Sequence, residues 1–316
     1  MRRVLTIVVL PDSQMYFADD LRHFAVFESQ IEWILANRET FNIRFVTHLG
    51  DIVQSDDQSE TEWQAAQRQM RRLDGLVPYG FCPGNHDMAP GGAARLYSTY
   101  FPSEYYRRFS WWADDSNENR ANCQLFSGNG VDFVCVHLQF MPTDQDLEWA
   151  VQRFRDHSQR FGILTTHMYL GEGGPGDRSI QVTSRDSRLA VRNWDLRTFA
   201  EKTPMNRQGN NAGLEILDRV VRRARNVRIV LSGHYGEHEL IASELPGRTV
   251  FQFLANFQGE PNGGNGWLQL LQFDLYEGVI REAVFSPWLD GYWEGRDVMH
   301  TLKYQAVDGK VDDPDL

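Results

Sequence analysis

The chain alternates short apolar runs with longer stretches in which apolar residues recur at helical spacing. Five of the apolar runs are rich in β-branched residues and end at a polar cluster, and they cover residues 4–10, 43–47, 77–82, 162–166 and 227–231. Runs of this kind predict buried strands. Helical periodicity is found in residues 24–35, 60–73, 144–157 and 213–225. Because strands and helices alternate along the chain, the pattern predicts an α/β fold.

Some stretches depart from this alternation. Residues 89–121 and 171–212 have no clean period, so we expect long loop excursions there. From about residue 249 the chain is β-rich, and we expect these strands to form a second sheet. We expect residues 1–316 to form a single domain that carries these excursions.

The composition narrows the class of protein. The chain has 316 residues, of which 41% are hydrophobic and 24% are charged, as is typical of a globular protein. The formal net charge of −11 repels polyanions, so a small substrate is favoured and a nucleic acid polymer is unlikely as a partner. Bound divalent metals would add local positive charge that the formal count omits. The sequence leaves the oligomeric state open.

Two features bear on the compartment. The N-terminal apolar run has a basic start, but it is short, lacks a small-residue cleavage site and leads directly into Asp12. It is therefore interpreted as a core strand rather than a signal peptide. No long apolar span follows, and we expect a cytoplasmic protein with no membrane partner. The cysteines Cys82, Cys123 and Cys135 lack metal-binding spacing and are expected to be buried and reduced.

Carboxylate and amide side chains follow the first two predicted strands. Asp12 and Gln14 come after the first run, and the pair Gly50-Asp51 comes after the second. Because side chains at strand ends can converge on one crevice, these residues are candidates for a two-metal site. Two cations about 3.5 to 4 Å apart need a bridging carboxylate, and Asp51 suits that role. A turn or a helix cap is the alternative interpretation of each residue taken alone.

The most specific cluster is Gly84-Asn85-His86-Asp87, directly after the third run. Asn85 offers a carbonyl oxygen to a metal. His86 could hydrogen-bond a phosphoryl oxygen or protonate a leaving group, and Asp87 could orient the His86 ring. An ordinary Asn-His turn is the alternative, but the position after a buried strand favours a functional site.

Histidines end the last two predicted strands. His167 and His234 each precede loop signals, and His238 lies shortly after the second of them. A lone histidine is more often a structural residue. Two imidazoles at equivalent strand ends, with oxygen donors nearby, favour metal ligation by Zn, Fe or Mn.

The order Asp, Gly-Asp, Gly-Asn-His-Asp, His and Gly-His resembles calcineurin-like metallophosphoesterases, and it spans Val4 to about His238. Residues 262–271 are similar to a bacterial branch of that superfamily whose first motif is also Pro-Asp-x-Gln. The resemblance implies a four-layer α/β/β/α metallophosphoesterase sandwich with mixed sheets. It also implies two divalent metal ions, Mn, Fe or Zn, and a metal-bridging hydroxide as the nucleophile.

Carried over residue by residue, the resemblance implies that Asp12 and Gln14 hold the first metal and that Asp51 bridges both. The second metal would be held by three further residues, Asn85, His167 and His234. Two positions depart from the family pattern. Gln14 replaces an imidazole by an amide, and Gly236 stands where the family has its last histidine. His238 is then the remaining candidate ligand for the first metal.

The sequence therefore predicts a metal-dependent phosphoesterase. The preferred substrate is a small organic phosphodiester, with His86 assisting the leaving group and with Tyr169 and Asn265 as candidate substrate-binding residues. Hydrolysis of a phosphomonoester, a phosphotriester or another ester on the same centre is the alternative. An inactive metal-binding or ligand-binding module is the alternative of another class, motivated by Gln14 and the displaced His238. His86 favours the enzyme, because metal binding alone does not require it.

Overall fold

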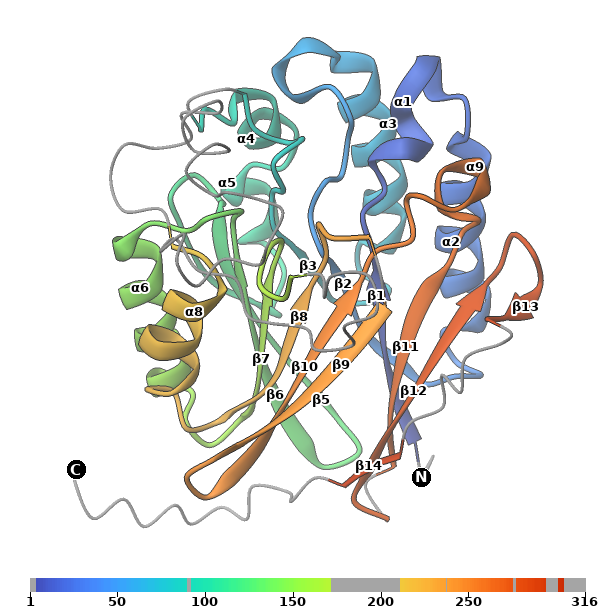
Figure 1. Cartoon of the computed structure of the whole chain (residues 1–316). Coiled ribbons are helices and arrows are strands. Elements are labelled where there is room, and N and C mark those ends of the chain that lie inside the picture. The colour runs from blue at the N-terminus through green and yellow to red at the C-terminus, as the bar shows by residue number, and fades with distance from the viewer. Residues whose placement is uncertain are drawn as a thin grey trace.

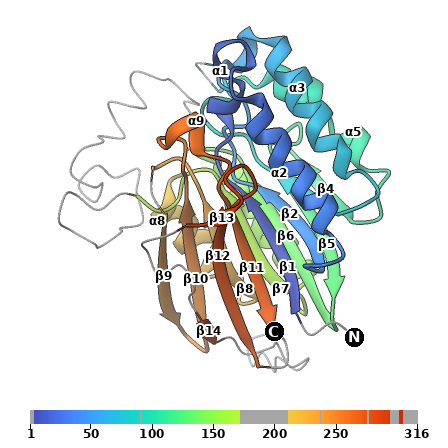
Figure 2. The same ribbon diagram turned by 90° about the vertical axis from the view of Figure 1, so that its right-hand side faces the viewer.

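The structure is a computed structural model that describes residues 4–89, 92–171, 211–236, 238–274, 277–293 and 301–303. Within these residues two β-sheets pack face to face, and helices cover the outer face of each sheet (Figures 1 and 2). The predicted α/β/β/α sandwich with mixed sheets is confirmed. The excursion expected at 171–212 lies almost wholly outside the described residues.

The first sheet has seven strands in the order β13-β12-β11-β1-β2-β3, with β14 paired to β12. Its parallel part consists of β1 (Val4–Leu10), β2 (Ile43–His48) and β3 (Tyr79–Phe81). Its antiparallel part consists of β11 (Leu268–Asp274), β12 (Val279–Ser286), β13 (Gly291–Tyr292) and β14 (Thr301–Lys303). Strand β1 thus lies between an early strand, β2, and a late one, β11.

The second sheet also has seven strands, in the order β4-β5-β6-β7-β8-β10-β9. Four of them are parallel to one another: β6 (Val131–Leu138), β7 (Phe161–Thr166), β8 (Val227–Ser232) and β10 (Arg248–Ala255). The strands at the two edges are antiparallel to their neighbours: β4 (Trp112–Ser116), β5 (Ala121–Gly128) and β9 (His238–Leu245).

The C-terminal strands do not form a sheet of their own, so that expectation was wrong. Strand β10 joins the second sheet beside β8, whereas β11 and β12 extend the first sheet from β1. Each of these runs does form a strand. Their partners lie far away in sequence, and a local apolar pattern does not specify which of two sheets a strand will join.

Alternate side chains of β1 pack into the two different cores of the sandwich. Leu5, Ile7 and Val9 are buried in the core between the two sheets, whereas Val8 and Leu10 belong to the core that includes the helices. Because successive side chains of a strand point to opposite faces, one apolar strand serves both cores. This explains why the run from 4 to 10 is apolar throughout rather than alternating.

The helices lie on the two outer faces of the sandwich. Figure 2 shows three of them over the first sheet, namely α1 (Gln14–Leu21), α2 (Phe24–Asn37) and α3 (Glu60–Met70). Against the second sheet lie α6 (Asp144–Asp156), α8 (Gly213–Ile216) and the π-helical turn Leu217–Val221 (Figure 1). Short 3₁₀ turns flank α3, with Asp56–Gln58 before it and Arg71–Leu73 directly after it. No helix of the described residues is long and apolar enough to cross a bilayer.

The stretch expected as an excursion at 89–121 contains short elements where it is described. These are α4 (Arg95–Tyr100), α5 (Ser103–Tyr106) and β4 at the sheet edge. Aromatic side chains of the two helices are buried, and the ring of Phe101 lies 4.9 Å from that of Phe81 in β3. Helices of four to six residues are too short to produce a recognisable period, which is why the sequence shows none here.

Candidate metal centre

The predicted site residues lie where strands of both sheets end. Main-chain hydrogen bonds tie the loops after these strands together: Ser13 N donates to Asp51 O at 3.0 Å, and Gly233 N donates to His167 O at 2.9 Å. The first bond joins the loops after β1 and β2, and the second joins those after β7 and β8. The ends of four strands thus frame one position between the two sheets.

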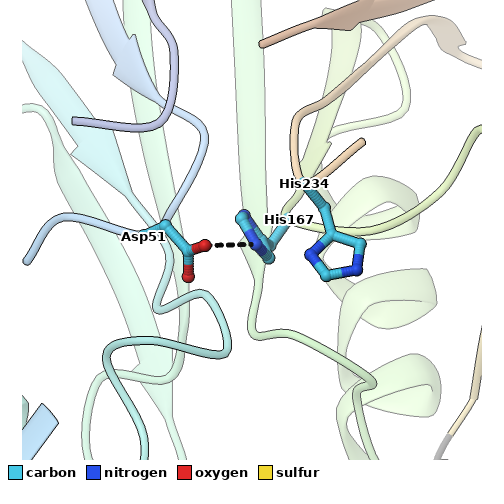
Figure 3. A group of neighbouring side chains, drawn as sticks. All are labelled: Asp51, His167 and His234. Atoms are coloured by element: carbon cyan, nitrogen blue, oxygen red, sulfur yellow. Dashed lines mark ion pairs between the residues drawn. The ribbon is translucent and has the colours of Figure 1, made fainter. Parts of the chain in front are cut away.

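Three of the predicted ligands come together there (Figure 3). Asp51, His167 and His234 each offer a ligand atom, and these atoms lie within 4.8 Å of one another. The Nε2 atom of His167 lies 3.2 Å from Oδ2 of Asp51 and 3.0 Å from Oδ1 of Asn85. A carboxylate, an amide oxygen and two imidazoles therefore lie close enough together to hold one cation.

The ring of His167 is oriented for ligation. Its Nδ1–H donates to the main-chain oxygen of Leu49 at 3.0 Å, which directs Nε2 towards Asp51. A metal-binding histidine commonly makes this kind of bond through its other ring nitrogen. Burial alone would lower the pKa of His167, but the Asp51 and Asp12 carboxylates raise it to about 9. Without a metal, His167 is therefore positively charged at neutral pH and partly offsets the charge of Asp51.

Asp51 lies at the centre of these contacts. It is buried and adopts a left-handed conformation, with φ of 48°. The main-chain N–H of His86 donates to its Oδ1 at 2.8 Å, while Oδ2 faces His167. Burial would raise the pKa of Asp51, but the positive charge and hydrogen bond of His167 lower it below its ordinary value. The carboxylate is therefore ionised and available to a cation.

Two glycines allow this close packing. A Cβ added at Gly84 would lie 2.2 Å from Oδ1 of Asp51, and one added at Gly233 would lie 2.2 Å from Oδ1 of Asp12. Any side chain at either position would displace a candidate ligand. The glycines of the Gly-Asn-His-Asp and Gly-His motifs are thus required by contact with the carboxylates.

Asp12 is anchored beside the cluster rather than directly within it. Its Oδ2 accepts hydrogen bonds from the main-chain N–H of His234 at 3.1 Å and from the side-chain amide of Asn256 at 2.8 Å. Asn256 also donates to His234 O at 3.0 Å, so it fixes the turn that carries the His234 ring. Burial raises the pKa of Asp12 well above its ordinary value.

Asn256 is a functional candidate that the sequence analysis missed. It directly follows β10, as the predicted ligands follow their own strands. The signal that identified Asp12 and Asp51, a polar residue at the end of an apolar run, was therefore present there too.

Gln14 and His238, the two departures from the family pattern, have different surroundings. Gln14 begins α1 and is 5% exposed, and its Oε1 has no hydrogen-bond partner among the described residues. His238 begins β9, and its Nε2 contacts Oε1 of the buried Glu282 in β12. That contact joins the two sheets, so the structure does not bring His238 into the cluster with Asp51.

His86 and Asp87, the residues predicted for acid–base catalysis, bond to different partners. The Nδ1–H of His86 donates to Gln54 O at 3.2 Å. Asp87 does not orient that ring as expected. It is fully buried, and its oxygens accept main-chain N–H bonds at 2.8 to 3.0 Å from Ile52, Val53 and Gly84. Burial, with Asp51 nearby, raises the pKa of Asp87 to about 7 against the effect of these bonds. Asp87 thus joins the loops after β2 and β3.

The two candidate substrate-binding residues lie in structural contacts. Tyr169 is fully buried, and its hydroxyl donates to Oε1 of Gln252 at 2.6 Å. Asn265 follows the short helix α9 (Pro261–Gly264) in a left-handed conformation, and its side-chain oxygen accepts a bond from Asn262 at 3.0 Å. Neither contact brings the residue to Asp51 or His167.

The donor set fits a divalent cation at one position. Asp51, Asn85, His167 and His234 supply two oxygens and two nitrogens in close proximity, the mixture that Zn, Fe and Mn accept. The residues predicted for the other position, Asp12 and Gln14, flank Ser13, whose main-chain N–H donates to Asp51 O.

The chain is similar in sequence to known proteins. The family model described as calcineurin-like phosphoesterase matches residues 5–237. An uncharacterised protein of Bacillus subtilis (strain 168), YvnB, is 32% identical over 294 residues, which are 90% of this chain and 20% of YvnB. The chain therefore spans about a fifth of the length of the curated relative it matches.

Solved structures show the same fold at low sequence identity. Purple acid phosphatase PPD1 from yellow lupin (Lupinus luteus) seeds superposes with a TM-score of 0.58 at 13% identity, covering 97% of this chain and 55% of that one. A dimetal phosphatase from Danio rerio superposes with a TM-score of 0.53 at 14% identity, covering 96% and 100%. At these identities the likeness concerns the fold alone.

Proposed function

The chain belongs to the calcineurin-like phosphoesterase family, and on that premise we propose that it is a metal-dependent phosphodiesterase acting on a small organic phosphodiester. The observation that carries this proposal is the convergence of Asp51, His167 and His234 within 4.8 Å, with Asn85 bonded to the same imidazole. Loops that follow strands of both sheets supply these donors.

These residues would hold divalent metals, which would supply positive charge to the phosphoryl oxygens and make a water molecule a better nucleophile. The chain's own residues orient these parts. Leu49 O fixes the ring of His167, and the backbone N–H of His86 fixes the carboxylate of Asp51. Rigid donors of this kind need no rearrangement when charge develops in the transition state.

His86 is the proposed proton donor. Its Nδ1–H is held by Gln54 O, so its Nε2 is the nitrogen left to carry a proton to the leaving oxygen. As the new P–O bond forms, the ester P–O bond breaks, and that proton neutralises the departing alkoxide. The main-chain bond from His86 to Asp51, which holds this loop against a proposed ligand, supports the assignment.

The charge of the site favours a diester over a monoester. The groups that act most strongly on Asp51, His167 and His234 are one another, Asp12 and His86, and within the described residues no Lys or Arg is among them. A monoester dianion needs more compensating charge than a diester monoanion. Since no Lys or Arg of the described residues acts on these groups, and the net charge is −11, the singly charged substrate is the better match.

Turnover of bis-nitrophenyl phosphate and of nitrophenyl phosphate, each measured with added Mn²⁺, tests the proposal. We expect the diester to be hydrolysed faster, and we expect Asp51→Asn and Asn85→Ala to abolish both reactions. Asp132→Asn is the matched control. Asp132 is exposed and lies at the start of β6, whereas the site residues follow the ends of strands. Turnover that survives in both site variants would overturn the assignment, and a faster monoester would overturn the substrate class.

A further inference from the structure

The carboxylate of Asp12 has capacity for a cation next to the cluster. His234 links the two places, because its main-chain N–H donates to Asp12 while its ring lies with Asp51 and His167. The bonds from Asn256 and His234 are made mainly to Oδ2, and within the described residues the hydrogen bonding of Oδ1 is limited to the 3.4 Å contact with His234 N. A carboxylate can accept about four bonds, so a cation can still bind Asp12.

Gln14 supplies a second oxygen of the right kind. It is 5% exposed and lies two residues after Asp12, and its Oε1 is a buried acceptor without a hydrogen-bond partner in the described part of the chain. An acceptor that is buried without a partner costs about 1 to 3 kcal/mol. A bound cation would remove that cost. The neighbouring Ser13 is fixed to the backbone of Asp51 and Ile52, which holds this turn against the cluster.

The nearby imidazoles are committed elsewhere. His238 contacts Glu282 between the sheets. His48 is fully buried and uses both ring nitrogens, since Nε2 bonds Ser13 Oγ at 2.9 Å and Nδ1 accepts from Gly50 N at 3.2 Å. Among the residues that the structure describes, the place beside Asp12 thus has oxygen donors where the family pattern has imidazoles.

We propose that the two metal positions are chemically unequal. In this proposal the first position is built from the oxygens of Asp12, Gln14 and Asp51 and takes a hard, exchangeable cation such as Mg²⁺ or Mn²⁺. The second, with two imidazoles, retains Zn²⁺ or Fe²⁺ tightly. The inference rests on the proposed function for the presence of a metal centre. Carboxylate and amide oxygens suit Mg and Mn, whereas imidazole suits Zn and Fe.

Metal binding can be measured without any assay of activity. The full chain is stripped with a chelator, reloaded with Zn²⁺, desalted and analysed for metal, and the Zn-loaded protein is then titrated with Mn²⁺ by electron paramagnetic resonance. We expect about one Zn²⁺ to remain per chain, and one further, weaker Mn²⁺ site. Two retained Zn²⁺ ions, or no Mn²⁺ binding to the Zn-loaded protein, would overturn the inference.

Variants of Gln14 identify the weak site. Gln14→Ala should weaken Mn²⁺ binding about 10-fold or more without changing the Zn²⁺ content. Gln14→His should let the protein retain a second Zn²⁺ ion after desalting, because it restores an imidazole. If Gln14→Ala does not fold, Gln14→Glu provides the test, since an added carboxylate should tighten Mn²⁺ binding. Unchanged Mn²⁺ affinity in whichever of these variants folds would count against the assignment.

His234→Ala is the control, because it should lose the Zn²⁺ ion and leave Gln14 intact. Hydrolysis of bis-nitrophenyl phosphate is followed separately on the same preparations. Unequal metal sites with no turnover would refute the proposed function but not this inference. Turnover with two equally retained Zn²⁺ ions would refute this inference but not the proposed function.

Discussion

Nε2 of His167 lies 3.2 Å from Oδ2 of Asp51, and both residues are almost completely excluded from solvent. Burial would favour the neutral form of each, but their proximity stabilises the charged pair instead. This raises the pKa of His167 to about 9 and lowers that of Asp51. A metal ion must therefore compete with a proton for the same nitrogen.

Metal affinity should depend on pH for that reason. The pKa of His167 in the metal-free fold, about 9, exceeds its ordinary value of 6.5. The stabilising pair is thus complete below pH 6.5 and is lost as the pH rises through 9. We expect Zn²⁺ affinity to increase from pH 6 to pH 9, with release of about one proton per ion at pH 7. Calorimetry in two buffers of different ionisation enthalpy measures this release, and an affinity that stays constant over the range would contradict it.

Breaking the contact between His238 and Glu282 should affect stability rather than metal content. Glu282 is fully buried, so His238→Ala leaves a buried carboxylate without this partner. We expect the free energy of unfolding to fall by about 1 to 3 kcal/mol, the cost of a lost buried hydrogen bond. Urea denaturation measures the loss, and metal analysis should show the wild-type content. Lost metal with unchanged stability would instead identify His238 as a ligand.

The glycine of the Gly-Asn-His-Asp motif should not tolerate even one methyl group. In Gly84→Ala the added Cβ would overlap Oδ1 and the main-chain nitrogen of Asp51, so the loop carrying this carboxylate must move. Misplacement of a catalytic group by about 1 Å can cost about 100-fold in rate. We expect a loss of this size in turnover, together with reduced metal content. Gly259→Ala, which meets no atom within 4 Å, is the matched control and should behave as wild type.

His86 should affect the chemical step alone. Its side chain contacts Gln54 O, whereas only its main-chain N–H reaches Asp51, and that N–H survives substitution. We therefore expect His86→Ala to lower kcat by about 100- to 10,000-fold with unchanged metal content. The loss should be larger for a diester with an alkyl leaving group than for one with nitrophenol, because an alkoxide needs the proton more. Equal losses on both substrates would argue against proton donation.

The sequence predicted those strands in which an apolar run is followed directly by a polar residue. The runs that became β1, β2, β7 and β8 are apolar on both faces, and a polar residue after each marks the end of the strand. Asp51, His167 and His234 could be proposed for one centre because those strand ends meet.

Contacts made across the fold could not be inferred in this way. Glu282 follows no polar motif, and its contact with His238 exists only because β9 and β12 belong to different sheets that face each other. Two of the main-chain partners of Asp87, Ile52 and Val53, likewise come from a loop more than thirty residues away in sequence. Neither periodicity nor spacing encodes such a partner, because the choice is made when the two sheets pack.

The place of β1 in its sheet has a consequence for how the chain folds. On one side β1 pairs with the antiparallel strand β11, so that Val4 lies opposite Asp274. On its other side β1 pairs with the parallel strand β2. The sheet that carries Asp12 therefore cannot be completed until residue 274 has emerged from the ribosome. Pairings between such distant segments slow folding, and a nascent chain would expose the unpaired edge of β1 until β11 has been made.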